Sequence, residues 1–182
     1  MSGTRIALLS AAAVLVFWMV GAYNRLVALR SAIGAAWAQV DQQLQRRHAF
    51  LQQLVSGLRP HLVNDASALA ALEGALLQVQ AAAERVRARP VAAPLVAVLV
   101  KAEDVLAMAQ ARVVALLEHH PALRDDSPEV AQPLAALHEL ESRLTFARQL
   151  FNEAAQSYND AARQFPTRLL TRLYGFGTAG RV

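Results

Sequence analysis

A seven-residue hydrophobic repeat near the end of the chain restricts the fold most. Large apolar residues recur at every seventh position from residue 130 to residue 165, with a second row three positions later. Both rows fall on one face of a helix, as in helices that pack along their length. The first row is Val130, Leu137, Leu144, Phe151, Tyr158 and Phe165; the second is Leu140, Ala147, Ala154 and Ala161. We predict one long helix that stops before Pro166, because proline disfavours helix at the preceding residue.

A second repeat of this kind runs from residue 33 to residue 58 and predicts another long helix. Its rows are Ile33, Val40 and Leu54, and Trp37, Leu44, Leu51 and Leu58. Between the long helices we predict two shorter ones: the first capped by Asn64 or Asp65, the next from Pro94 to about Glu118, where Pro121 ends the pattern. Ser127 then caps the last helix. The sequence therefore predicts an all-α fold, an antiparallel four-helix bundle with two long and two short helices.

The segment from Ile6 to Ala22 carries no charge and is almost entirely apolar. Its length of about 26 Å as a helix is close to the thickness of a membrane core. We predict an uncleaved transmembrane anchor over residues 1–22 that includes Ile6 and Phe17, with Trp18 and Tyr23 at the membrane interface. A cleaved signal peptide is the alternative, and the flanking arginines give no preferred orientation.

The predicted lengths bring the end of the last helix back to the membrane. The bundle would cover residues 23–165, and a basic amphipathic tail would cover residues 166–182. In that tail, apolar side chains would enter the headgroup region while arginines face phosphates. The residues concerned are Arg168, Leu169, Arg172, Leu173, Tyr174 and Phe176. The alternative is that these residues pack on the base of the bundle.

The net charge of +4 equals the four arginines between Ala161 and Val182, a stretch without acidic residues. This distribution favours contact with membrane lipid over nucleic acid, for which no recognition motif is present. The chain has no cysteine, and the Glu118-His119-His120 run lacks the spacing of metal ligands. We therefore expect no cofactor, no metal and no catalytic residues.

Arg46 and Arg47 interrupt the apolar repeat of the first long helix. If Tyr23 and Phe165 lie at one level, residues whose numbers add up to about 188 face each other across the long helices. That register pairs Trp37 with Phe151, Arg47 with Glu141, and Asp41 with Arg148. We interpret the charges as structural partners within the packed face; a contact site for an anion or a protein is the alternative.

Three segments together resemble the LemA family of bacterial membrane proteins. They are YNRLVALRSAIGAAWAQVDQQLQRRHAFLQQLV from Tyr23, LESRLTFARQLFNEAAQSYND from Leu140, and FPTRLLTRLYGF from Phe165. The resemblance implies a single-pass protein of the bacterial inner membrane with a helical-bundle domain and no known enzymatic activity. We expect a non-enzymatic scaffold or adaptor for an unidentified protein partner. The alternatives are a membrane-shaping homo-oligomer acting through the tail and a cleaved, exported bundle.

Overall fold

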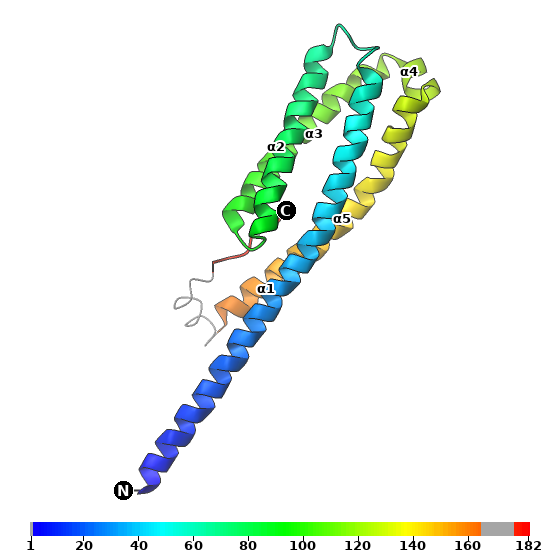
Figure 1. Ribbon diagram of the computed structural model, residues 1–182. Helices are drawn as coiled ribbons and strands as arrows, with labels where there is room; N and C mark the ends of the chain where they lie inside the picture. Colours follow the sequence, from blue (N-terminus) through cyan, green and yellow to red (C-terminus); the bar gives the residue numbers. More distant parts are fainter. Residues whose placement is uncertain (1, 165–176) are drawn as a thin grey trace.

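The computed structural model describes residues 2–164 and 177–182 (Figure 1). The described residues form five helices: α1 (Ser2–Leu58), α2 (Ala66–Ala88), α3 (Ala93–Glu118), α4 (Pro121–Asp126) and α5 (Pro128–Arg163). The all-α prediction is confirmed, with α1 and α5 long and α2 and α3 shorter. The short helix α4 was not predicted. Proline is tolerated in the first turn of a helix, so Pro121 begins α4 rather than a loop.

The predicted helix starts are nearly right in position. Asp65 and Ser127 occupy the N-cap positions of α2 and α5, although neither side chain makes a capping hydrogen bond. Pro94 lies in the first turn of α3, where its missing N–H leaves no helical bond unmade.

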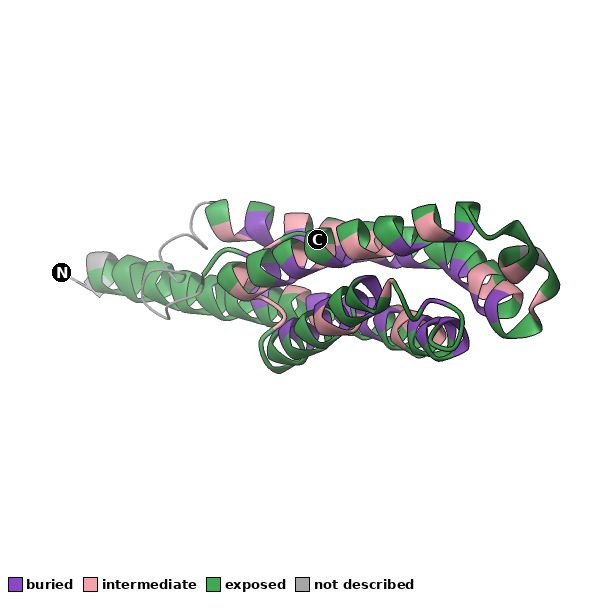
Figure 2. Ribbon diagram, turned by 90° about the horizontal axis from the view of Figure 1, so that it is seen from above, coloured by how far each residue is buried: buried purple, intermediate pink, exposed green. Residues whose placement is uncertain are grey.

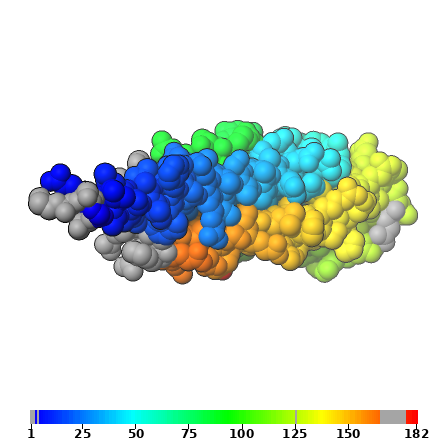
Figure 3. Space-filling model, turned by 90° about the horizontal axis from the view of Figure 1, so that it is seen from below, coloured from blue at the N-terminus to red at the C-terminus, as the bar shows by residue number. Residues whose placement is uncertain are grey.

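The long helices α1 and α5 pack antiparallel, and their register agrees with the prediction. The rings of Trp37 and Phe151 meet edge to face with centroids 5.7 Å apart. Towards the end of α5, Arg25 donates a 3.5 Å hydrogen bond to Gln164. Figure 3 shows α5 alongside the second part of α1, while the first part of α1 protrudes. The α5 helix therefore ends beside the position where α1 emerges from the bundle.

Burial along α1 changes sharply at Leu26. From Arg5 to Arg25 every residue is exposed except the half-buried Ala22, whereas Leu26 is fully buried (Figure 2). The helix itself continues without interruption from Ser2 to Leu58. The apolar first part of α1 therefore projects from the bundle as a single rigid extension.

The helices α2 and α3 form a hairpin that packs on α1 through α2 (Figure 1). Among the described helices, α3 and α5 make no close main-chain contact. Residues 177–182 lie between them instead: Ala179 hydrogen-bonds to Asn159 of α5, and Gly180 lies against Ala93 and Val96 of α3. The fold is thus two helix pairs joined through α1 and α2, with the end of the chain between α3 and α5.

Candidate functional site: a polar cleft between the helix pairs

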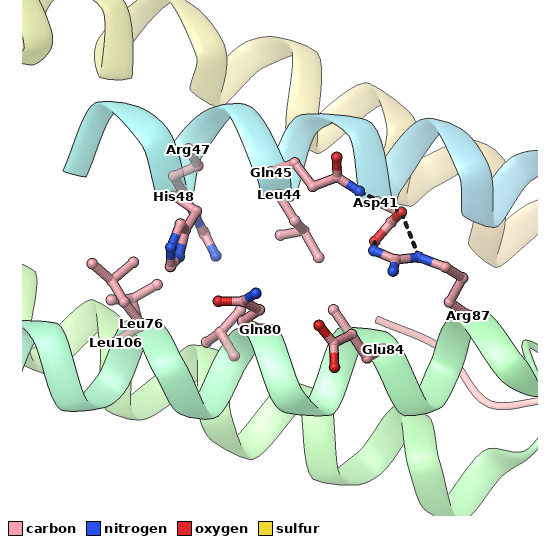
Figure 4. A pocket seen from close by; sticks show the side chains of 12 residues that line it. Asp41, Leu44, Gln45, Arg47, His48, Leu76, Gln80, Glu84, Arg87 and Leu106 are labelled. Atoms are coloured by element: carbon pink, nitrogen blue, oxygen red, sulfur yellow. Dashed lines mark hydrogen bonds and ion pairs between the residues drawn. The ribbon is translucent and has the colours of Figure 1, made fainter. Parts of the chain in front are cut away.

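A cleft of about 340 Å³ lies where the α2–α3 hairpin meets α1. Its size is within the range of small-molecule sites, roughly 300–1,000 Å³. Figure 4 shows Arg47 and His48 at one end and the Asp41–Arg87 pair at the other, with Glu84 on the α2 side. The apolar wall consists of Leu44, Leu76, Val79, Ala83 and Leu106. The cleft therefore combines polar side chains from α1 and α2 with this apolar wall.

Asp41 lies at one end of the cleft and accepts hydrogen bonds from three donors. Arg87 donates from Nε and Nη2 to its two oxygens at 3.0 and 2.9 Å, and Gln45 donates at 2.9 Å. Gln45 lies one helical turn after Asp41 and so reaches the same carboxylate. The hydrogen bond to Asp41 raises the pKa of Arg87, opposed by partial burial and aided by the charges of Asp41 and Glu84. This pair fastens the last turn of α2 to α1.

Glu103 of α3 joins two arginines from different helices. Its carboxylate accepts hydrogen bonds from Arg47 of α1 and from Arg148 of α5. The side chains of Glu103 and Arg47 are only 14% and 17% exposed, so water screens this contact weakly. Because the three side chains come from three helices, the cluster ties the α2–α3 hairpin to the α1–α5 pair.

The chemistry of the cleft is that of ion pairs. Asp41 at one end of the cleft is hydrogen-bonded to Arg87, and Arg47 at the other end is hydrogen-bonded to Glu103. Within the described residues, no group of three or more histidine or acidic side chains is arranged to hold a metal ion. The arrangement positions the helices relative to one another and leaves a polar cleft whose volume is in the range of small-molecule sites.

A protein-family model described as the LemA family matches residues 36–181. The chain belongs to the LemA family. The matched part includes both ion-pair clusters and residues 177–181. A search of curated proteins finds no match. Family membership confirms the resemblance seen in the sequence.

Two of the predicted charge pairs in this LemA-family chain are wrong. Arg47 pairs with Glu103 rather than Glu141, and Asp41 pairs with Arg87 rather than Arg148. The prediction considered only the two long helices. The α2–α3 hairpin covers the face of α1 on which Asp41 and Arg47 lie. Arg87 and Glu103 of the hairpin therefore pair with them instead of residues of α5.

The remaining predicted contact residues divide into two groups. Glu141 and Arg46 are exposed, and the structure brings neither into the cleft. Arg148 does not line the cleft either, but it forms an ion pair with Glu103. The missing partners, Arg87 and Glu103, each lie near other charged residues in an alanine-rich helix, and nothing in the sequence separates them from neighbours that face solvent.

The predicted anchor residues all lie on the exposed first part of α1. Exposure is 63% for Ile6, 78% for Phe17, 43% for Trp18 and 42% for Tyr23. The predicted membrane-surface residues of the tail, Arg168 to Phe176, lie outside the described residues. Residues 177–182, the end of the predicted tail, pack on the bundle.

Asn152 and Asn159 of α5 hold the end of the chain, a role that was not predicted from the sequence. Asn159 bonds to both the N–H and the carbonyl of Ala179, and Asn152 bonds likewise to Val182. The hydroxyl of Tyr158 donates to the carbonyl of Gly177 at 3.2 Å. The seven-residue spacing of the two asparagines places them on one face of α5, and this spacing is the signal that the sequence contains.

Proposed function

We propose that this LemA-family chain is a non-enzymatic scaffold or adaptor, anchored in the bacterial inner membrane by the first part of α1. The observation that carries the proposal is the continuity of α1. One helix is apolar and exposed up to Arg25 and is packed in the bundle from Leu26 onwards. A continuous helix of this kind would hold the bundle at a fixed distance from the membrane.

Length and composition support a single membrane crossing. Within the described residues, two helices are long and apolar enough to span a membrane. The mean hydropathy of an 18-residue window is 2.2 in α1 and 1.2 in α2. None of the apolar window of α1 is buried, whereas 44% of that of α2 is buried. The apolar face of α2 already has partners in α1 and α3, so α1 is the helix that needs lipid.

The geometry also supports a partner surface away from the membrane. From Leu26 to Leu58, α1 extends about 50 Å at 1.5 Å per residue. The loop before α2, and α4, lie at the far end of that distance (Figure 1). Purified chain that turns over a substrate, and loses that turnover on a single side-chain change, would overturn the non-enzymatic part of the proposal.

The anchor is tested by placing charge in the apolar part of α1. Leu15→Arg with Phe17→Arg should release the chain from membranes washed with alkaline carbonate, since each arginine at a helix centre costs about 2.5–3.5 kcal/mol on insertion scales. The matched control is Leu77→Arg with Met108→Arg, because these residues are 63% and 66% exposed on the bundle. The control should stay in the membrane fraction. Equal extraction of the two variants would contradict the proposed anchor.

A membrane-shaping oligomer is the second candidate, supported by the four arginines and the lack of acidic residues between Ala161 and Val182. In that case, Arg168→Glu with Arg172→Glu should reduce flotation with anionic liposomes but not with neutral ones. Flotation that is unchanged by the two substitutions would eliminate this candidate.

A further inference from the structure

Residues 177–182 occupy a slot between α5 and α3. The α5 side of the slot contacts mainly the main chain of this segment. Asn159 donates to the Ala179 carbonyl at 3.0 Å and accepts from the Ala179 N–H at 2.8 Å. Asn152 donates to the main-chain oxygen of Val182 at 2.7 Å and accepts from the Val182 N–H at 3.0 Å. Each carboxamide thus satisfies both polar groups of one residue, as a neighbouring strand would in a sheet. Such contacts recognise extended backbone, whatever its side chains.

The spacing of the two asparagines matches an extended peptide. Seven residues along α5 cover about 10.5 Å, and three residues of extended chain cover about 10 Å. Ala179 and Val182 are three residues apart and bind to Asn159 and Asn152, which are seven apart. The segment therefore runs antiparallel to α5, with its main-chain groups in step with the helix.

Side-chain selectivity comes from the α3 side of the slot. A Cβ atom on Gly180 would lie 2.7 Å from Cβ of Val96 and 2.9 Å from Cα of Ala93, closer than real Cβ contacts. Ala179 is buried, Val182 packs on the core, and Arg181 between them is exposed. The slot thus accepts a small residue, then glycine, then any residue, then an apolar one.

We propose that this slot is a peptide-binding site and that it exchanges residues 177–182 between two copies of the chain. The chain's own segment already meets every requirement of the slot, so a second copy supplies an ideal occupant. Residues 165–176 link α5 to the segment and can extend to about 40 Å. Gln164 is only six residues, or about 9 Å along α5, from Tyr158, where Gly177 binds. This surplus of chain length permits residues 177–182 to reach the slot of a second copy. Two-fold exchange between the copies would reproduce in each slot the contacts seen within one chain.

The slot is tested first with a peptide. Full-length chain carrying Gly180→Leu keeps every slot residue but has a resident segment that does not fit. A fluorescein-labelled peptide with the sequence of residues 177–182 should bind it, measured by fluorescence anisotropy. Adding Asn152→Ala and Asn159→Ala should weaken binding roughly a hundredfold, because four hydrogen bonds are lost. The same peptide with leucine in place of its second glycine is the control and should not bind.

Exchange between copies is tested by mixing two differently tagged chains with complementary defects. One carries Gly180→Leu and keeps its slot; the other carries Asn152→Ala with Asn159→Ala and keeps its segment. We expect the mixed pair to co-purify roughly tenfold more than either chain with itself, since only the mixture offers an intact slot to an intact segment. Arg181→Ala, an exposed change in the same segment, should exchange like the unaltered chain.

Two results would overturn the proposal. Failure of the peptide to bind would show that the slot is not a binding site. Peptide binding without preferential recovery of the mixed pair would show that the segment docks only within its own chain. Circular dichroism checks that each variant remains helical, and Gly180→Ala replaces Gly180→Leu if the larger residue unfolds the chain.

Discussion

At the scale of single residues, Glu103 has the most consequential contacts in the bundle. Its one carboxylate forms ion pairs with two arginines, and it is the only described acidic side chain that bridges α1 and α5 from α3. Sequence patterns place Glu103 on a helix but give no reason to choose it over the adjacent Asp104. That choice depends on how the hairpin sits on α1, a three-dimensional property that a single sequence does not contain.

Replacing Glu103 with glutamine should destabilise the bundle by about 2 kcal/mol, because two partly buried arginines then lose their counter-charge. The free energy of unfolding from urea titration measures this effect. The control is Asp104→Asn, an exposed neighbour of the same charge that should change stability by less than about 0.5 kcal/mol. Equal effects of the two substitutions would show that the cluster does not support the fold.

Tyr158 should make stability sensitive to alkaline pH. Burial raises its pKa above the ordinary value of 10.0, and the charge of Arg30 partly opposes that rise. The neutral phenol is thus favoured in the folded chain. Its contribution is complete below pH 10.0 and is lost as the pH rises through the higher folded pKa.

The test compares the chain with Tyr158→Phe in urea titrations at neutral pH and just above pH 10. We expect the variant to be less stable at neutral pH by about 1 kcal/mol, because it lacks the hydrogen bond to Gly177. Above pH 10 the two stabilities should converge. A constant difference at both pH values would contradict the role assigned to the buried hydroxyl.

At the scale of helices, the sequence predicted the register of the α1–α5 pair and the positions of α2 and α3, but not how the α2–α3 hairpin packs on α1. Large residues such as Trp37 and Phe151 repeat every seven positions and define a register that the structure confirms. The faces of α2 and α3 are rich in alanine, which packs with similar energy in several registers. The segment 177–182 has no periodicity, so no helical pattern predicts where it packs, and its contacts with Asn152 and Asn159 were not predicted.

The close approach of α1 to the start of α5 gives a prediction with an internal control. A Cβ atom on Gly57 would lie 2.9 Å from the carbonyl oxygen of Glu129, and Pro133 has no N–H to bond that carbonyl. Gly57→Ala should therefore cost about 1–2 kcal/mol in the free energy of unfolding.

Gly74→Ala is the matched change in α2. Nothing lies within 4 Å of its added Cβ, so it should instead stabilise the helix by about 0.5–1 kcal/mol. Chemical denaturation of both variants measures the two effects. A gain in stability from Gly57→Ala would show that the two helices are free to separate at this point.

At the scale of the whole molecule, the chain is a rod with an exposed apolar end and a bundle end. The exposed apolar part of α1 forms one end, and the connections around α4 form the other (Figure 1). The end of α5 beside Arg25 marks the boundary between them. The proposed membrane anchor depends on that division, because it assigns the first part of α1 to lipid and leaves the bundle to protein partners.

Depth-dependent fluorescence quenching tests this division most directly. The chain has no cysteine, so Phe17→Cys and Ser127→Cys each give a single labelling site for a fluorophore. In liposomes that contain brominated lipids, we predict strong quenching at position 17 and none at position 127, about 50 Å or more from the bilayer. Equal quenching at both positions, or none at position 17, would contradict the membrane-anchored rod.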